Sequence, residues 1–264
     1  MLIAHLSDLH ITGIDPETRR NQKASAAIKR VANLQPPADC LLISGDLVEN
    51  GSREEYRFLH TQLQNLDLPI YVVLGNHDGR AHFREIFANY PGVAQSSGPV
   101  QYCIDQWPLQ IIALDTLIEG RAEGQLTPES LDWLDSTLAR APHKPTLILM
   151  HHPPTAIGLD GLDAIRLNEG RERFTRIVAA NPQIERILCG HVHRASHTRF
   201  AGTVVSTSSA TGMQSHLDFS VNAKAVMIAE PACMQLHINL PDQGLVSHTA
   251  FIDDDFPKAT LGAN

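Results

Sequence analysis

Three short apolar runs near the start of the chain, separated by two longer stretches of helical periodicity, constrain the fold most. The runs have the length and composition of buried β-strands and cover residues 2–7, 40–44 and 70–74. Between them, apolar side chains recur at helical spacing over residues 17–34 and again after Ser52, which precedes Glu55 in the pattern of a capping box. This order of strands and helices predicts a parallel sheet with helices packed on it.

The remaining chain continues the alternation and becomes mostly β-structure towards its end. We expect a short helix near 80–88, strands near 100–105 and 109–114, a helix from Pro128, a strand at 146–150, a helix near 169–180, and strands at 185–189, 203–207, 233–239 and 245–252. Residues 153–168 are rich in Pro, Gly and Asp and predict a long loop near a binding site. The acidic tail after Asp253 predicts irregular structure. We therefore predict a catalytic domain over 1–215 and a β-rich extension over 216–264, which completes a sheet or forms a dimer surface.

Five short motifs with metal-binding groups follow predicted strands in a fixed order. They are Asp8-Leu9-His10, Gly45-Asp46, Gly75-Asn76-His77-Asp78, His151-His152 and Gly190-His191-Val192-His193. Each motif alone is compatible with an ordinary turn, because Gly, Asn and Asp are common turn residues. Together they supply carboxylate, imidazole and carboxamide ligands from five strand ends. That set suits two adjacent divalent cations and the hydrolysis of a phosphate ester.

The composition narrows the class of protein further. The chain has 264 residues and a net charge of −8, which argues against an extended nucleic-acid surface. No secretion signal and no apolar run of membrane-spanning length are visible, so we expect no membrane association. The four cysteines are scattered, and Cys40 and Cys189 lie in apolar strand patterns. Free buried thiols and a cytoplasmic location are the favoured interpretation.

The motif series resembles that of the calcineurin-like metallophosphoesterase superfamily, over roughly residues 1–210. The likeness is greatest to the branch of class III cyclic nucleotide phosphodiesterases and glycerophosphodiesterases, and it rests on Ser7-Asp8-Leu9-His10, Gly75-Asn76-His77-Asp78, Met150-His151-His152-Pro153-Pro154 and Cys189-Gly190-His191-Val192-His193. The resemblance implies a four-layer αββα sandwich of two mixed β-sheets flanked by helices. It also implies a binuclear centre that hydrolyses small phosphodiesters by attack of a metal-bridging hydroxide.

The same resemblance assigns the ligands. The first metal would be held by Asp8, His10, Asp46 and His193, and the second by Asp46, Asn76, His151 and His191. His77 would face the phosphate as a catalytic residue, either stabilising charge or protonating the leaving oxygen. Mn²⁺, Fe²⁺ or Fe³⁺, and Zn²⁺ all suit such ligands. Substrate contacts are expected from His152, Asn168, His197 and His216.

Charge counting favours a diester as the substrate. Two divalent cations, two carboxylates and one hydroxide leave about one positive charge, which matches a singly charged diester and its transition state. Asn50 stands where protein phosphatases of the superfamily carry an arginine that clamps a phosphomonoester.

A phosphomonoesterase or nucleotide pyrophosphohydrolase on the same scaffold is the alternative function. A nuclease, or an interaction module without metals, is a weaker alternative. The β-rich C-terminal end also suits the contact surface of a homodimer or a higher homo-oligomer.

Overall fold

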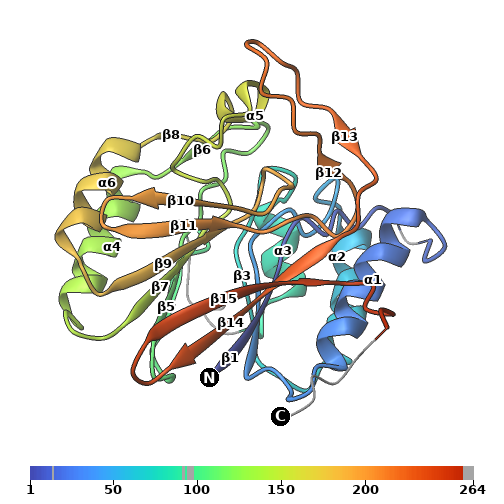
Figure 1. Ribbon diagram of the computed structural model, residues 1–264, viewed down its shortest axis with the longest axis horizontal. Helices are drawn as coiled ribbons and strands as arrows, with labels where there is room; N and C mark the ends of the chain where they lie inside the picture. Colours follow the sequence, from blue (N-terminus) through green and yellow to red (C-terminus); the bar gives the residue numbers. More distant parts are fainter. Residues whose placement is uncertain (14, 91–92, 94–97, 258–264) are drawn as a thin grey trace, which may run out of the picture.

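The computed structural model describes residues 1–13, 15–90, 93 and 98–257, and within them two β-sheets face each other between outer layers of helices (Figure 1). The first sheet has the order β15-β14-β1-β2-β3, with strands at Gly244–Phe251, Cys233–Leu240, Leu2–Leu6, Cys40–Ile43 and Ile70–Val72. The second has the order β10-β11-β9-β7-β5-β4, with strands at Ser196–Phe200, Thr203–Thr207, Ile184–Cys189, Thr146–Leu149, Gln110–Ala113 and Tyr102–Ile104. The predicted sandwich of two mixed sheets flanked by helices is confirmed.

Helices cover the outer face of each sheet. On one side of Figure 1 lie α1, α2 and α3, at Arg19–Ala32, Arg53–Leu63 and Arg80–Ile86, and on the other lie α4 and α6, at Pro128–Ala139 and Arg171–Ala180. Their apolar faces are buried: Ile28 and Val31 of α1 join a core that also contains Leu147 and Leu149 of the second sheet. A second core joins Leu134 of α4 to strands of the second sheet. Burial of these faces is the main stabilisation of the sandwich.

Strand direction places the motifs at one edge of each sheet. Strands β1, β2 and β3 run parallel, as the sequence predicts, so their following loops lie side by side. In the second sheet β7 and β9 are also parallel and adjacent. Parallel strands end at the same edge, which brings together the residues that follow all five strands.

Several local signals in the sequence are confirmed. Ser52 and Glu55 form a capping box at α2, and Pro128 occupies the first turn of α4 after Thr127 as N-cap. All four cysteines are free, and Cys40 and Cys189 are buried. None of the helices in the described ranges combines the length and the apolar character that crossing a membrane requires.

Other parts differ from the prediction. The predicted loop at 153–168 contains α5 (Asp160–Asp163) and leads into β8 (Leu167–Glu169), which pairs with β6 (Gly124–Gln125). The polar edge strand β10 was not predicted, because its side chains lack an apolar repeat. Strands β12 (Gln214–Ser215) and β13 (Met227–Ile228) form the base of a projecting arm (Figure 1). In the tail, Asp254 pairs with Arg30 at 3.1 Å, whereas residues 258–264 lie outside the described residues.

Candidate metal centre

The loops after β1, β2 and β9 hold their acidic and histidine residues in an unusual backbone conformation. Asp8, His10 and Asp46 have φ of 51°, 47° and 48°, and His191 and His193 have φ of 70° and 47°. Residues with a side chain rarely adopt this left-handed region, and such strain persists where the surroundings fix it, often at functional sites. These five are five of the seven non-glycine residues with positive φ in the described ranges. The backbone is therefore bent to direct these side chains inwards.

Short contacts tie the loops to each other. The backbone N–H of Asp8 donates to the carbonyl of Gly45 at 3.1 Å, and that of His10 donates to the carbonyl of Asp46 at 3.0 Å. The backbone N–H of His191 donates to Oδ1 of Asp8 at 3.1 Å, which joins the last motif to the first. A side chain at Gly190 would overlap the Asp8 carboxylate and Ser7, so glycine is required there. The motifs thus form one connected unit, although 183 residues separate Asp8 from His191 in sequence.

The first group of candidate ligands is formed by Asp8, His10, Asp46 and His193. Nε2 of His193 lies 3.4 Å from Oδ1 of Asp8 and 3.0 Å from Nε2 of His10. Nε2 of His10 lies 3.6 Å from Oδ2 of Asp46. Two imidazole nitrogens and two carboxylates facing one point are the donor set that a divalent cation prefers.

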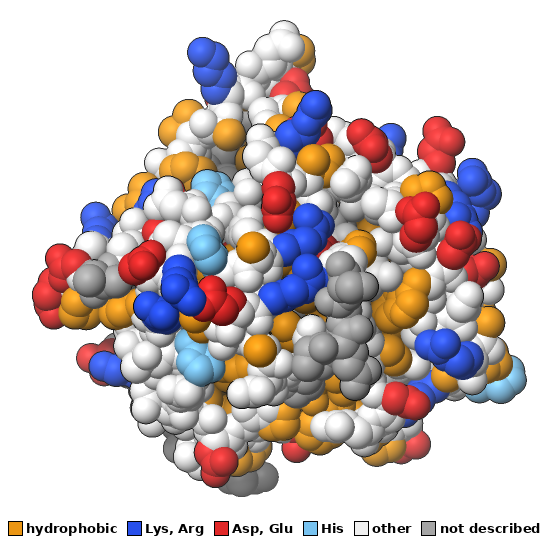
Figure 2. Space-filling model, turned by 180° about the vertical axis from the view of Figure 1, so that it is seen from behind, with side chains coloured by type: hydrophobic (Ala, Val, Ile, Leu, Met, Phe, Trp, Pro, Cys, Tyr) orange, Lys and Arg blue, Asp and Glu red, His pale blue; other side chains and the backbone are white. Residues whose placement is uncertain are grey.

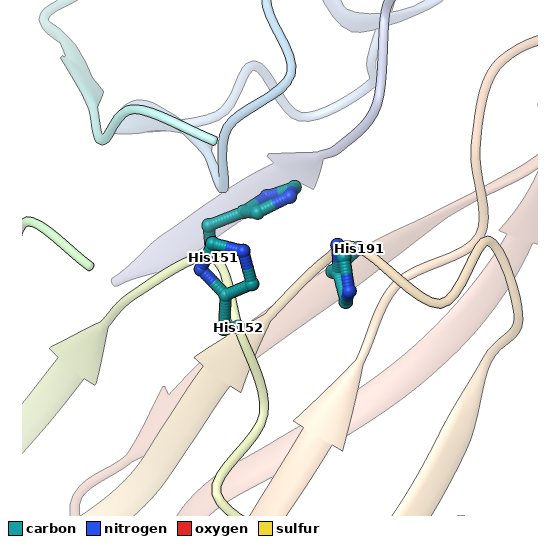
Figure 3. Close-up of side chains that lie close together, drawn as sticks. All are labelled: His151, His152 and His191. Carbon is teal, nitrogen blue, oxygen red and sulfur yellow. The ribbon is translucent and has the colours of Figure 1, made fainter. Parts of the chain in front are cut away.

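The second group lies on the other side of Asp46. Oδ2 of Asp46 is 3.4 Å from Nε2 of His151, and Oδ1 of Asn76 lies 3.2 Å from that nitrogen and 2.9 Å from Nδ1 of His191. His151 and His191 come from the ends of the neighbouring strands β7 and β9, with ring centres 5.1 Å apart (Figure 3). Oδ2 of Asp46 is therefore common to both groups, which is the geometry of a carboxylate between two cations.

Three of the histidines are oriented through their second ring nitrogen. Nδ1 of His151 lies 2.7 Å from the carbonyl of Ser44, and Nδ1 of His193 lies 2.9 Å from the carbonyl of Met213. Nδ1 of His10 lies 2.8 Å from the carboxylate of Glu49. An acceptor at Nδ1 fixes the proton there and leaves the Nε2 lone pair free for a metal. The acceptors thus make all three rings suitable ligands.

The buried Asp46 and His151 side chains shift each other's pKa. Burial alone would raise the pKa of Asp46, but His151 and His10 hold that pKa well below its ordinary range. Burial alone would lower the pKa of His151, but Asp46 raises it to about 9. Burial, followed by the charge of His151, lowers the pKa of His191 to about 3, although Asp46 opposes the shift. Asp46 is thus an anion in a buried position, which needs cations around it.

Asp78 joins the loop after β2 to the loop after β3. Its carboxylate accepts hydrogen bonds from the backbone N–H groups of Leu47 at 3.1 Å and Gly75 at 2.9 Å, and from the Tyr56 hydroxyl at 3.0 Å. Burial, followed by the charge of Asp46, raises the pKa of Asp78 to about 6. Because it binds both loops at once, Asp78 fixes the position of Asn76 relative to Asp46.

A cavity of about 490 Å³ opens over the two groups. Its walls include seven of the predicted site residues, namely Asp8, His10, Asp46, Asn76, His77, His191 and His193. Leu162 and Ile165, from the region at 153–168, also line the cavity, and so do Met213 and Ser215. Leu162 in turn packs against Val192, between the two histidines of the last motif.

His77 lies at the rim of this cavity. Its backbone N–H donates to Oδ1 of Asp46 at 2.9 Å, and its ring meets that of His10 edge to face at 4.7 Å. Nδ1 of His77 lies 2.9 Å from the carbonyl of Glu49, so it carries the proton and Nε2 is the nitrogen left for a ligand. The side chain is 37% exposed, compared with 12% for His10 and 14% for His193.

The four expected substrate contacts lie outside the walls of the main cavity. His152 is buried, with Nδ1 2.8 Å from the Thr116 hydroxyl and Nε2 3.1 Å from the carbonyl of Ala122. His152 therefore supports the neighbouring rings (Figure 3). Nδ2 of Asn168 donates to the carbonyl of Ala164, and Nδ1 of His197 lies 3.0 Å from Ser206 on β11.

His216 is exposed on the arm and lines a small pocket that shares Leu162 and Ser215 with the main cavity. His152, Asn168 and His197 are thus held by contacts outside the main cavity, whereas His216 lies beside it.

Two charged residues at the site were missed by the sequence analysis. Glu49 lines the cavity and contacts His10, and Arg20 of α1 lines it too, with a guanidinium nitrogen 2.6 Å from Oε1 of Glu49. Asn50, by contrast, bonds Glu55 at 2.8 Å. No sequence signal marks Glu49 or Arg20, because each lies outside the ligand motifs and is brought in by the fold.

Residues 1–195 match the family model of the calcineurin-like phosphoesterases. The chain belongs to this family. A protein from Arcobacter nitrofigilis named probable glycerophosphodiester phosphodiesterase GpdQ is 34% identical over 256 residues, which cover 96% of this chain and 93% of the relative. A protein from Synechococcus named probable cyclic nucleotide phosphodiesterase is 37% identical over 198 residues, or 73% of each chain.

Solved structures of calcineurin-like phosphoesterases extend the likeness to the fold. A dimetal phosphatase from Danio rerio has a TM-score of 0.64 at 15% identity and covers 96% of this chain and 99% of its own. At such identity the comparison supports the architecture alone. The family match makes the chain a phosphoesterase, and its His and Asp side chains form groups that could hold a metal ion.

Proposed function

We propose that this phosphoesterase hydrolyses small phosphodiesters, with two divalent metal ions held by the two side-chain groups that share Asp46. The first ion would be held by Asp8, His10, Asp46 and His193, and the second by Asp46, Asn76, His151 and His191. The position of Asp46 Oδ2, 3.6 Å from Nε2 of His10 and 3.4 Å from Nε2 of His151, is the observation that carries this proposal.

The donor atoms fit such ions. Asp46 Oδ2 and Asn76 Oδ1 both lie within 3.4 Å of Nε2 of His151, and Asn76 Oδ1 lies 2.9 Å from Nδ1 of His191, so oxygen and imidazole donors converge there as a divalent cation requires. Bound metals would supply Lewis acidity and an activated water near neutral pH. Mn²⁺, Fe or Zn²⁺ all suit a set of His, Asp and Asn ligands.

Side chains around the metal groups would hold a proton, orient a ligand and exclude water during the reaction. His77, with its Nδ1 proton held by the Glu49 carbonyl, presents Nε2 to the cavity and would hold a proton there for the leaving oxygen. Glu49 would keep the ring of His10 in its ligand orientation. Leu162 and Ile165, from the 153–168 loop, would shield the reacting phosphate from bulk water.

Glycerophosphodiesters and cyclic nucleotides are the substrates that the names of the relatives suggest. Asn50 supports a diester over a monoester, because its side chain is bonded to Glu55 and offers no guanidinium clamp for a dianion. Lys and Arg side chains are interspersed with Asp and Glu on the face seen in Figure 2, a pattern that favours a small substrate over a nucleic-acid polymer.

A substrate panel tests the proposal. The protein is stripped of metal by a chelator, reloaded with Mn²⁺, Fe²⁺ or Zn²⁺, and assayed on bis(p-nitrophenyl) phosphate, p-nitrophenyl phosphate, glycerophosphodiesters and cyclic nucleotides. We expect a higher kcat/KM on the nitrophenyl diester than on the monoester. A higher value on the monoester would favour the alternative, a phosphomonoesterase or pyrophosphohydrolase on this scaffold.

A further inference from the structure

A second cavity, of about 420 Å³, adjoins the metal cavity at the beginning of α1. Its lining residues are Arg19, Arg20, Lys23, Gly212, Met213, Ala229, Glu230, Pro231 and Asp253. Arg20, Gly212 and Met213 line both cavities. The two cavities are therefore neighbours, with these three residues at the boundary between them.

Positive charge is concentrated where α1 enters this cavity. The first turn of α1 carries Arg19 and Arg20 and no acidic residue, and Lys23 follows one turn later. The free backbone N–H groups of a helix N-terminus already carry partial positive charge, so cations there are unfavourable unless an anion is near. Three cations thus lie together at this end of α1, in a chain whose net charge is −8.

Nearby carboxylates neutralise only part of this charge. Asp253 pairs with Lys23 at 3.2 Å, Glu230 pairs with Arg194 at 2.5 Å, and Glu49 pairs with Arg20. Across the described residues, no ion pair or hydrogen bond is found for Arg19. Its guanidinium is therefore available to a ligand in this cavity.

The beginning of α1 is fixed relative to the metal centre. The buried side chain of Asn21 accepts a hydrogen bond from the backbone N–H of Thr12 at 2.9 Å and donates to the carbonyls of Thr12 and Asp15 at 3.0 and 2.7 Å. Thr12 lies two residues beyond His10. The backbone that carries the cations is thus fixed relative to the ligand groups before any substrate binds, which reduces the entropy lost on binding.

We infer that the second cavity binds an additional anionic group on one arm of the diester substrate, while the diester itself lies at the metal centre. This inference rests on the proposed function and specifies its substrate class. The preferred diester would carry a phosphate or carboxylate several bonds away from the reacting phosphorus. Guanidinium and ammonium groups bind such anions by charge-assisted hydrogen bonds, and two or three of them favour a phosphate.

Two substrates that differ only in the second anion provide the test. Thymidine 5′-(p-nitrophenyl phosphate) and its 3′-phosphate derivative share the reacting diester and the leaving group. We expect the 3′-phosphorylated substrate to have a kcat/KM about tenfold higher, the low end for a charge-assisted contact at a part-exposed site. Higher ionic strength should reduce this ratio, because salt screens exposed charges.

Substitutions then assign the preference to the cavity. The double variant Arg19→Gln/Lys23→Gln should bring the ratio of the two kcat/KM values close to one. Lys29→Gln is the matched control, because Lys29 is an exposed cation in the last turn of the same helix, and it should keep the ratio. A wild-type ratio near one, or a ratio that survives in the double variant, would overturn the inference.

A binding measurement separates this inference from the proposed function. In isothermal titration calorimetry of the metal-loaded protein, thymidine 3′,5′-bisphosphate should bind about tenfold more tightly than thymidine 5′-phosphate. Equal affinities would also overturn the inference. If the protein hydrolyses neither nitrophenyl substrate, the proposed function is contradicted. The calorimetric ratio would still decide whether the second cavity binds the additional anion.

Discussion

Glu49 and His10, which are 39 residues apart in sequence, are joined by a contact of 2.8 Å between the carboxylate and Nδ1 of the ring. The contact makes Glu49 a positioning residue for a candidate metal ligand. Burial would raise the pKa of Glu49, but the hydrogen bonds of His10 and Arg20 lower it to about 2. Glu49 therefore stays charged at neutral pH and keeps the His10 proton on Nδ1.

Removing the Glu49 carboxylate should weaken metal binding without removing a ligand. We expect Glu49→Ala to lower metal affinity by about 10–100-fold, as for other partners of metal-bound histidines. Glu49→Gln should keep part of the affinity, because its amide oxygen still accepts from Nδ1. Titration of the chelated protein with Mn²⁺ measures both. Glu54→Gln, at an exposed position of α2, is the control; wild-type affinity in Glu49→Ala would show that the contact is incidental.

The sequence predicts which loops meet at the site, but it does not predict the residues that surround the ligand groups. Strand β1 ends before Asp8 and strand β7 before His151, and parallel strands end at a common edge, so motif order alone brings these groups together. Arg20 could not be found in this way. It lies on a surface helix, and its contact with Glu49 depends on how α1 is anchored to the loop after β1. Strand β10 was missed because an exposed edge strand needs no apolar repeat.

Asp46 is the one side chain shared by both ligand groups, so its substitution should affect both metals. We expect about two metal ions in the wild-type chain and fewer than about one in Asp46→Asn, because the amide lacks the charge that a bridging position needs. His10→Ala should empty mainly one position. Metal analysis of purified, dialysed protein distinguishes these outcomes. Full occupancy and activity in Asp46→Asn would contradict the bridging assignment.

The buried His5 should make the metal-free protein sensitive to acid. Burial lowers the pKa of His5 to about 3, although a hydrogen bond with Gln235 opposes the shift. Between that value and the unfolded value of about 6.5, the unfolded chain binds more protons, so stability falls as the pH falls through this window. At pH 5 this group alone should cost about 2 kcal/mol.

Urea unfolding in the presence of a chelator measures that effect. Between pH 7.5 and pH 5, the free energy of unfolding should fall less in His5→Leu than in the wild type, by about 2 kcal/mol. His5→Leu should also be less stable at pH 7.5, because Nε2 of His5 lies 2.9 Å from the hydroxyl of Ser44 in the wild type. An equal loss in both proteins would assign the acid sensitivity to other groups.

The arm that carries β12 and β13 exposes a group of large apolar side chains, some of which are visible on the projection in Figure 2. Its exposed members are Leu217, Phe219, Val221, Val226 and Met227, and Phe219 and Val221 are 68% and 84% exposed. An apolar group of this kind on a projection commonly marks an interface. We expect the arm to mediate self-association into a homodimer or larger homo-oligomer.

Light scattering over a range of protein concentrations tests that expectation. Phe219→Ser/Val221→Ser should shift the protein towards the monomer, because both substitutions remove exposed apolar area. Lys224→Ser, on the same arm, should leave the oligomeric state unchanged. A wild-type chain that is monomeric at every concentration would remove this role for the arm.

His77 should matter most for substrates whose leaving oxygen needs a proton. Its Nδ1 is held by the Glu49 carbonyl, so Nε2 is the position from which a proton would reach the cavity. General acid assistance is typically worth about 10²–10⁴-fold. A nitrophenolate leaves readily without a proton, whereas a ribose or glycerol alkoxide does not. We therefore expect His77→Ala to lose most activity on glycerophosphodiesters and cyclic nucleotides, and less on bis(p-nitrophenyl) phosphate.

Metal analysis of the His77→Ala variant must accompany these rates, because the backbone N–H of His77 contacts Asp46. That contact does not involve the side chain, so the variant should retain its metals. An equal loss of activity on alkyl and nitrophenyl diesters would instead indicate that His77 stabilises charge on the phosphate. Loss of metal would show that the ring supports the ligands, and the acid role would then be wrong.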